Sequence, residues 1–416
     1  MLVLLARMTS VEPAVYRDRD FSIYLSSRFL TTIAMQVQSV AVGWQIYGIT
    51  HSAMSLGLVG LCQFVPMFLL TLPAGDVADR FDQRRVLSLS LFALGLCGMF
   101  LLVFTWVYPG RVGPFYAVLV LFGAARGFAG PASQSLMPFL IPKEKLPRAI
   151  AWNSSALQIA VIAGPALGGL LYVWGSATAY IACAVCFLAA GAGQASLGGR
   201  RREPGAGVAT TAIARVAEGV RFVRVRPIIL GAISLDLFAV LLGGATALLP
   251  VYARDILHIG PIGLGLLRSA PAVGAATVGL LLGRRPIQRH TGRRMFATVA
   301  LFGAATILFG LSTNFYLTLG ALVILGGSDM VSVFIRQSLI QTATPDAMRG
   351  RVSAVSVLFI GASNELGEFE SGVTAAWFGT VPAVVIGGIG TLAVVTLWMW
   401  LFPPLRRVDR LSDVAA

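Results

Sequence analysis

Nine charged side chains lie inside long apolar stretches of this chain. They are Arg28, Arg126, Asp236, Arg268, Asp329, Arg336, Glu365, Glu368 and Glu370. At ~2.5–3.5 kcal/mol each, nine lipid-facing charges would cost roughly 20–30 kcal/mol, which is more than a fold can absorb. These side chains must therefore face water, one another or a cavity, where carboxylates could carry protons or hold a cationic substrate.

Three of these acids follow one another closely near the end of the chain. Glu365 and Glu368 are three residues apart and share one face of a helix, whereas Glu370 lies about 200° around the helix from Glu368. Two carboxylates one turn apart in an apolar cavity cannot both ionise cheaply, so we expect one of them to hold a proton. Glu365 and Glu368 are candidates for proton carriage or cation binding, and we expect Glu370 to pair with a neighbouring helix.

The chain repeats itself at an offset of about two hundred residues. The tripeptide Gln-Ser-Leu at 134–136 and Arg148 recur as the same tripeptide at 337–339 and as Arg351, each 203 positions later. A duplicated membrane chain is typical of a secondary transporter, whose substrate site lies near the midplane between two similar bundles.

The repeat also relates two of the charged residues. Arg126 falls on Asp329 at the 203 offset, which predicts a proton-sensitive pair across a central cavity, with the arginine controlling protonation of the carboxylate. Alternatively, both are structural and have different partners. Arg336 lies two turns from Asp329 on the same helix face and could line the same route, and we include Asp236 among the candidates for proton coupling.

Composition defines the elements that must position these groups. With 56% hydrophobic and 12% charged residues, the chain is too apolar for a soluble globular protein. Runs of about 20 apolar residues predict transmembrane helices. Twelve are predicted, at 24–49, 52–75, 86–106, 114–140, 149–174, 176–198, 227–253, 262–284, 295–312, 316–340, 351–379 and 381–403. The expected fold is an all-α membrane protein with two pseudo-symmetric six-helix bundles, 1–198 and 227–416, joined by a cytoplasmic linker at 199–226.

The net charge of +14 has a topological explanation. Of the 32 Lys and Arg, 26 fall in the two termini and in every second loop, which places both termini and the linker in the cytoplasm. The charge therefore gives orientation and contact with anionic lipid, with no sign of a nucleic-acid surface. Within the linker, 211–226 is either an interfacial amphipathic helix or a partly helical connection.

The loop after the second predicted span carries a recognisable motif, Gly-Asp-Val-Ala-Asp-Arg-Phe-Asp-Gln-Arg-Arg at 75–85. It resembles the signature loop of the major facilitator superfamily, whose positions are filled here by Gly75, Asp79, Arg80 and Arg84. Asp82 and Gln83 depart from that pattern. The resemblance implies that Asp79 pairs with Arg84 or Arg85 as a latch that holds the cytoplasmic side shut. In the second half, Gln288 stands where the acid should be, so we expect the first-half latch to be the stronger.

A second motif, Gly-Pro-Ala-Leu-Gly-Gly at 164–169, resembles an element shared by exporters of the superfamily. Gly164, Pro165, Gly168 and Gly169 carry it, and it favours an antiporter over an importer. The glycines allow close helix approach, and the proline bends the helix. Residues 43–47 and 78–82 are similar to the branch that includes bacterial enterobactin exporters.

These observations lead to one expected function and several alternatives. We expect a monomeric, proton-coupled exporter of a siderophore-like or drug-like organic molecule in the bacterial inner membrane, with the substrate, protons and membrane lipids as its partners. The alternatives are a metal or cation exporter that uses the acids of the eleventh span, a lipid flippase and a transporter-like sensor. The three histidines lack metal-ligand spacing, and no phosphate loop or nucleophile–base set is present, so we expect neither a metal, a cofactor nor an enzyme.

Overall fold

The structure, a computed structural model, describes residues 18–198 and 212–411. Every regular element within these ranges is a helix. The first half contains six long helices and one 3-10 turn, η2 (Lys143–Lys145). The long helices are α2 (Arg19–Thr50), α3 (Ala53–Arg80), α4 (Gln83–Val107), α5 (Gly113–Leu140), α6 (Leu146–Val173) and α7 (Ser176–Ala195).

The second half begins with α8 (Ala212–Arg224), in the segment for which the sequence left an amphipathic helix and a partly helical connection open. Five long helices and two shorter ones make up most of the remainder. They are α9 (Pro227–Gly243), α11 (Gly260–Arg284), α12 (Thr291–Leu311), α13 (Phe315–Ala343), α14 (Asp346–Phe378), α15 (Thr380–Leu401) and α16 (Pro403–Arg407).

The seventh span is an interrupted helix. After α9 the chain continues as η3 (Ala245–Leu248), α10 (Leu249–Val251) and the π-helical turn η4 (Tyr252–Ile256). Pro250 has no N–H for a regular helical hydrogen bond. Since π-helical turns are rare and often mark functional sites, the sequence prediction of one continuous span at 227–253 missed an informative irregularity.

Local sequence explains where many helices begin and end. Asp18 caps α2 by accepting a hydrogen bond from the amide of Asp20 at 3.1 Å. Gly175, with φ 104°, separates α6 from α7, and Gly379, with φ 89°, separates α14 from α15. Both glycines adopt a conformation that other residues avoid, and they stand at corresponding turns of the two halves. The sequence repeat is thus also a repeat of backbone geometry.

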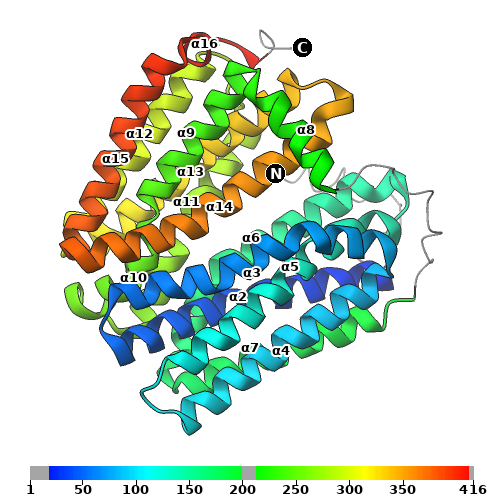
Figure 1. Cartoon of the computed structure of the whole chain (residues 1–416), viewed down its shortest axis with the longest axis vertical. Helices are drawn as coiled ribbons and strands as arrows, with labels where there is room; N and C mark the ends of the chain where they lie inside the picture. The colour runs from blue at the N-terminus through cyan, green and yellow to red at the C-terminus, as the bar shows by residue number, and fades with distance from the viewer. Residues whose placement is uncertain (1–17, 199–211, 412–416) are drawn as a thin grey trace, which may run out of the picture.

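The helices form two bundles, α2 to α7 and α9 to α15, which lie side by side (Figure 1). The bundles meet mainly along two seams: α3 against α14, and α6 against α11. Glycines permit this close approach. A Cβ atom added at Gly372 would lie 2.7 Å from the Cα atom of Gly57, and one added at Gly169 would lie 2.3 Å from the carbonyl oxygen of Pro261.

The two ends of the bundles differ. Helix α8 contacts α3, α9 and α14, and α16 contacts α9, so we call this side of the molecule the α8 end. At the opposite end, a buried apolar cluster joins the two bundles. It contains Val40, Tyr47 and Leu56 of the first bundle together with Leu249, Tyr252 and Leu264 of the second. Burial of these side chains holds the bundles together at that end.

Ten helical segments in the described part of the chain are long and apolar enough to cross a membrane. The two long helices outside this set are α2 and α14, which have sufficient length but carry many polar residues. Both pack within the bundles beside the apolar spans (Figure 1). The predicted all-α membrane protein with twelve transmembrane helices in two bundles is confirmed.

Candidate functional site

A cavity of about 410 Å³ lies between the two bundles. Its walls differ in chemistry. The first bundle contributes neutral hydrogen-bonding side chains, Gln36, Ser39 and Gln158. The second bundle contributes the charged side chains Arg268, Asp329 and Glu368. The cavity therefore combines neutral donors and acceptors on one side with one cation and two acids on the other.

Arg268 links the two walls of the cavity. One of its guanidinium nitrogens donates to the hydroxyl of Ser39 in α2, across the boundary between the bundles. Its Nε atom is buried and has no hydrogen-bond partner among the described residues. The sequence identified Arg268 only as one of nine intramembrane charges and assigned it no role. Gln158 also crosses the boundary, because its amide nitrogen donates to the carbonyl of Ala272 at 3.2 Å.

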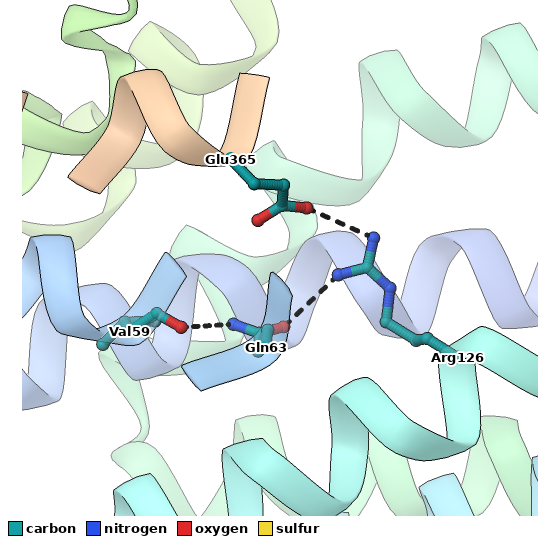
Figure 2. A network of polar contacts seen from close by, with 4 residues as sticks. All are labelled: Val59, Gln63, Arg126 and Glu365. Carbon is teal, nitrogen blue, oxygen red and sulfur yellow. Dashed lines mark hydrogen bonds and ion pairs between the residues drawn. The ribbon is translucent and has the colours of Figure 1, made fainter. Parts of the chain in front are cut away.

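The predicted pairing of Arg126 with Asp329 is wrong. Arg126 of α5 instead faces Glu365 of α14, with Nη2 3.6 Å from Oε1, and its Nη1 donates to Gln63 of α3 at 3.5 Å (Figure 2). The repeat relates equivalent positions inside each bundle. Contact across the cavity is decided by which helices meet at the seams, and α14 meets the first bundle there whereas α13 packs mainly within its own bundle.

Asp329 belongs to a charge cluster inside the second bundle. Asp236 of α9 forms an ion pair with Arg336 of α13, and only 5% and 1% of these two side chains are exposed. Asp329, two turns before Arg336 on the same helix, interacts electrostatically with both. Because Asp329 also lines the cavity, it connects the cavity to the buried pair. The sequence found all three residues but did not predict the Asp236–Arg336 pair.

The acids of α14 occupy different surroundings. Glu365 faces Arg126, whereas Glu368 lines the cavity and packs over Gly60 of α3, where an added Cβ atom would lie 3.2 Å from Oε2. Glu370 accepts a hydrogen bond from Thr374 of the same helix at 2.8 Å, so the expected pairing with a neighbouring helix is wrong. In the described ranges, no group of three or more His, Cys, Asp or Glu has the geometry to hold a metal ion.

A polar cluster joins the bundles at the end opposite α8. The Tyr47 hydroxyl donates to the carboxylate of Asp255, and the Arg254 guanidinium lies 5.5 Å from the centre of the Trp44 ring. Trp44 and Tyr47 belong to α2, while the charged partners belong to η4. Gly48 makes room for Arg254, since an added Cβ atom would lie 2.5 Å from its Nη1. The π-helical turn thus presents two charged side chains to the first bundle.

The signature loop at 75–85 is only partly described. Gly75 lies in α3, and the side chains of Asp79 and Arg80 lie outside the described atoms, so the predicted latch remains a prediction. Arg84 donates to the carbonyl of Leu197 at 2.8 Å, and Arg85 is exposed.

Asp82 departs from the family pattern, and the structure gives it a local role. It caps α4 by accepting a hydrogen bond from the Arg84 amide at 3.0 Å. In the second half, the acid at the start of the corresponding helix, α12, comes from a distant part of the chain. Asp409 accepts hydrogen bonds from the amide of His290 at 2.9 Å and from its Nδ1 at 2.8 Å, at the start of α12. No pattern in the sequence predicts this contact, which spans 119 residues.

The Gly-Pro motif of α6 sets helix distances, as the sequence predicted from its glycines. Cβ atoms added at Gly164 and Gly168 would lie 2.5 Å from Gln36 Cβ and 3.0 Å from Val37 Cα of α2, respectively. Gly169 contacts α11 of the other bundle, and Pro165 lines the cavity. The motif therefore positions one wall of the cavity and one seam between the bundles.

Two bundles of membrane-crossing helices, related by an internal repeat and enclosing a polar cavity between them, define the class of polytopic membrane transporters. The family model described as Major Facilitator Superfamily matches residues 24–368. This chain belongs to the Major Facilitator Superfamily.

Individual relatives agree with this assignment. Over 395 residues the chain is 26% identical to the enterobactin exporter EntS of Citrobacter koseri, a match that covers 93% of this chain and 92% of that protein. Over 172 residues it is 28% identical to the staphyloferrin A transporter of Staphylococcus aureus, covering 40% of this chain and 43% of that protein. The predicted resemblance to the branch that includes enterobactin exporters is confirmed.

Solved structures show the same fold. A bacterial homologue of the human lysosomal transporter Spinster, in an inward-facing and occupied conformation, has 14% identity and a TM-score of 0.70, covering 95% of this chain and 97% of that one. A D-xylose-proton symporter has 14% identity and a TM-score of 0.66, covering 94% and 98%. At these identities the likeness concerns the fold alone.

Proposed function

We propose that this chain exports a small organic molecule, siderophore-like or drug-like, across the bacterial inner membrane by proton-coupled alternating access. The observation that carries this proposal is the cavity between the bundles, with Asp329 and Glu368 in its wall. Its volume of about 410 Å³ lies within the range of ~300–1,000 Å³ that is usual for small-molecule sites. The two relatives reported above are named for enterobactin and staphyloferrin A, which supports an organic cargo.

Proton coupling is proposed to occur at Asp329. Arg336 has one positive charge and faces two carboxylates, Asp236 and Asp329, so one proton added to this cluster balances its charge. Asp236 forms the direct ion pair, which leaves Asp329 at the cavity wall to gain and lose the proton. A proton on Asp329 changes the charge that faces the cargo, and this change links cargo binding to the proton gradient.

The proposed topology places the α8 end in the cytoplasm, in accordance with the distribution of Lys and Arg. The Tyr47–Asp255 contact and the apolar cluster then lie on the periplasmic side. A carrier that is closed there is in the arrangement in which an exporter loads cargo from the cytoplasm. The bundles at 1–198 and 227–416 would rock about the cavity as two bodies, joined by the linker at 199–226.

Transport by reconstituted protein tests the proposal. Proteoliposomes loaded with pyranine report proton movement, while efflux of enterobactin or ethidium is measured with and without an imposed pH gradient. We expect an acid exterior to accelerate efflux of at least one of these probes. Asp329→Asn should lose this acceleration but retain counterflow exchange, whereas Glu370→Gln, outside the cavity, should keep both. Full gradient-driven efflux by Asp329→Asn would refute the assignment of the proton site.

The same preparation distinguishes cation export. Glu365 already faces Arg126, so a metal ion at the α14 acids would have to displace a guanidinium or a proton. Calorimetry with Mn²⁺, Fe²⁺ and Zn²⁺ in buffers of different ionisation enthalpy measures both metal binding and proton release. A saturable heat that is lost in Glu365→Gln but kept in Glu370→Gln would overturn the organic cargo in favour of a cation.

A further inference from the structure

A second cavity lies at the α8 end of the second bundle, away from the central site. It has a volume of about 370 Å³ and forms where α16 and the residues that follow it meet the beginning of α12. Six residues line it: His290, Arg293, Arg406, Arg407, Val408 and Asp409. None of the roles proposed for the central cavity involves these residues, so their clustering requires a separate explanation.

Backbone hydrogen bonds fix the base of this cavity. The amide of Thr291 donates to the carbonyl of Asp409 at 3.1 Å, and the amide of Gly292 donates to that of Val408 at 3.0 Å. The approach is close at Gly292, where an added Cβ atom would lie 2.0 Å from the carbonyl oxygen of Leu405. The arginines on this base are therefore held at a defined place relative to α12.

The cavity has an excess of positive charge. Arg293, Arg406 and Arg407 are exposed, and within the described ranges none of their guanidinium groups has a hydrogen-bond or ion-pair partner. The single acid, Asp409, is already engaged by His290. The hydrogen bond from the His290 amide, followed by the attraction of His290 itself, holds the pKa of Asp409 below its usual value. One ionised carboxylate cannot neutralise three guanidinium groups.

The cavity also lies close to an expected membrane surface. Helix α15 is one of the membrane-crossing candidates, and Trp400 and Leu401 in its last turn are 76% and 48% exposed. Exposed tryptophans at the end of a span are typical of the level of the lipid headgroups. Arg406 follows Trp400 by six positions, so the arginines stand just outside the hydrocarbon region.

We propose that this cavity binds the phosphate of an anionic phospholipid headgroup. Guanidinium groups pair with phosphate oxygens through two parallel hydrogen bonds, and basic pockets beside transmembrane helices bind headgroups of the cardiolipin type. The phosphate would bring together α12, which carries Arg293, and α16, which carries Arg406 and Arg407. Lipid binding would thus anchor the second bundle at one leaflet while the bundles move.

Native mass spectrometry of the whole protein in detergent tests this site. The protein is titrated with phosphatidylglycerol, cardiolipin and phosphatidylcholine, and dissociation constants are taken from the bound fractions. We expect the two anionic lipids to bind more tightly than phosphatidylcholine. Replacing Arg293, Arg406 and Arg407 together by Gln should raise the dissociation constants of the anionic lipids about a hundredfold, since each arginine contributes roughly a factor of five.

Two matched variants separate charge from folding. The triple Arg→Lys variant at the same positions should bind more weakly than the wild type but more tightly than the triple Gln variant, because the charge remains whereas the paired hydrogen bonds are lost. Arg221→Gln with Arg224→Gln removes two exposed charges from α8 and should leave lipid binding unchanged. Equal anionic-lipid affinity in the wild type and the triple Gln variant would overturn the proposal. A second result would also overturn it: inorganic phosphate protects the wild type but not the triple Gln variant against thermal unfolding, and no lipid competes with the phosphate. The ligand would then be free phosphate.

Discussion

The buried ion pair between Asp236 and Arg336 gives the sharpest stability prediction. Both side chains are almost inaccessible, at 5% and 1% exposed, so neither can recover hydration when its partner is removed. Removing one member of such a pair typically costs about 3–5 kcal/mol. We expect Asp236→Asn to lower the free energy of unfolding by an amount in this range. Glu365→Gln, at a wider and more exposed pair with Arg126, should cost about 1 kcal/mol or less.

Asp329 moderates this loss. It lies on the same face of α13 as Arg336, so it can take over part of the pairing when Asp236 is replaced. Asp236→Asn should therefore cost more in an Asp329→Asn background than in the wild type. A coupling of at least about 1 kcal/mol between the two substitutions is expected for residues that share one partner.

Unfolding in mixed micelles of increasing dodecyl sulfate content, followed by circular dichroism, measures these free energies. Replacing the whole pair, as Asp236→Leu with Arg336→Met, should recover much of the loss, because no charge is then left buried alone. The reasoning would be refuted if the free energy of unfolding of Asp236→Asn lay within about 0.5 kcal/mol of the wild-type value, or if the double apolar variant were less stable than Asp236→Asn.

Three further predictions concern the polar cluster opposite α8, the seam at Gly169 and the signature loop. Tyr47→Phe removes the hydrogen bond to Asp255, which is worth about 0.5–1.5 kcal/mol. The bundles should then part more often at this end, so a cysteine introduced at Leu56 of the apolar cluster should be labelled faster. Unchanged labelling would contradict a role of this contact in closing the end. Gly169→Val places its Cβ atom 2.3 Å from the carbonyl oxygen of Pro261, so it should slow transport without unfolding the protein. A normal transport rate in this variant would contradict the role of the seam. Asp79→Asn should favour the inward-open state and impair turnover at normal yield of folded protein. Unaltered transport and cysteine accessibility at the α8 end would exclude the latch.

The spans, and the two acids that face the cavity, could be predicted from the sequence. Apolar length located the spans because the hydrocarbon core imposes a minimum helix length. The cost of charge in lipid identified Asp329 and Glu368, which line the cavity. Their partners could not be predicted, since the repeat relates equivalent places in separate bundles. Contact between bundles depends on packing at the seams, which brings Arg126 to Glu365.

Other features had a weak signal or none. Gln36 and Gln158 line the cavity, but a single glutamine in an apolar run is compatible with any buried or lipid-facing position. Pro250 and Gly244 lie within the seventh predicted span, but neither residue type predicts a π-helical turn. Asp409 reaches the start of α12 from the far end of the chain, and such a contact is decided by tertiary structure alone.

The glycines at the seams have a mechanical consequence. A contact made by Gly57, Gly372 and Gly169 brings backbones together without interlocking side chains. Little apolar surface is covered by each glycine, so parting the helices exposes little to water, and no rotamer has to change first. At the seams the helix backbones therefore lie close together, but each glycine contact contributes little to holding the bundles together. Two surfaces of this kind offer small resistance to separation, so the apolar cluster and the Tyr47–Asp255 contact at the end opposite α8 would supply most of the resistance in the proposed cycle.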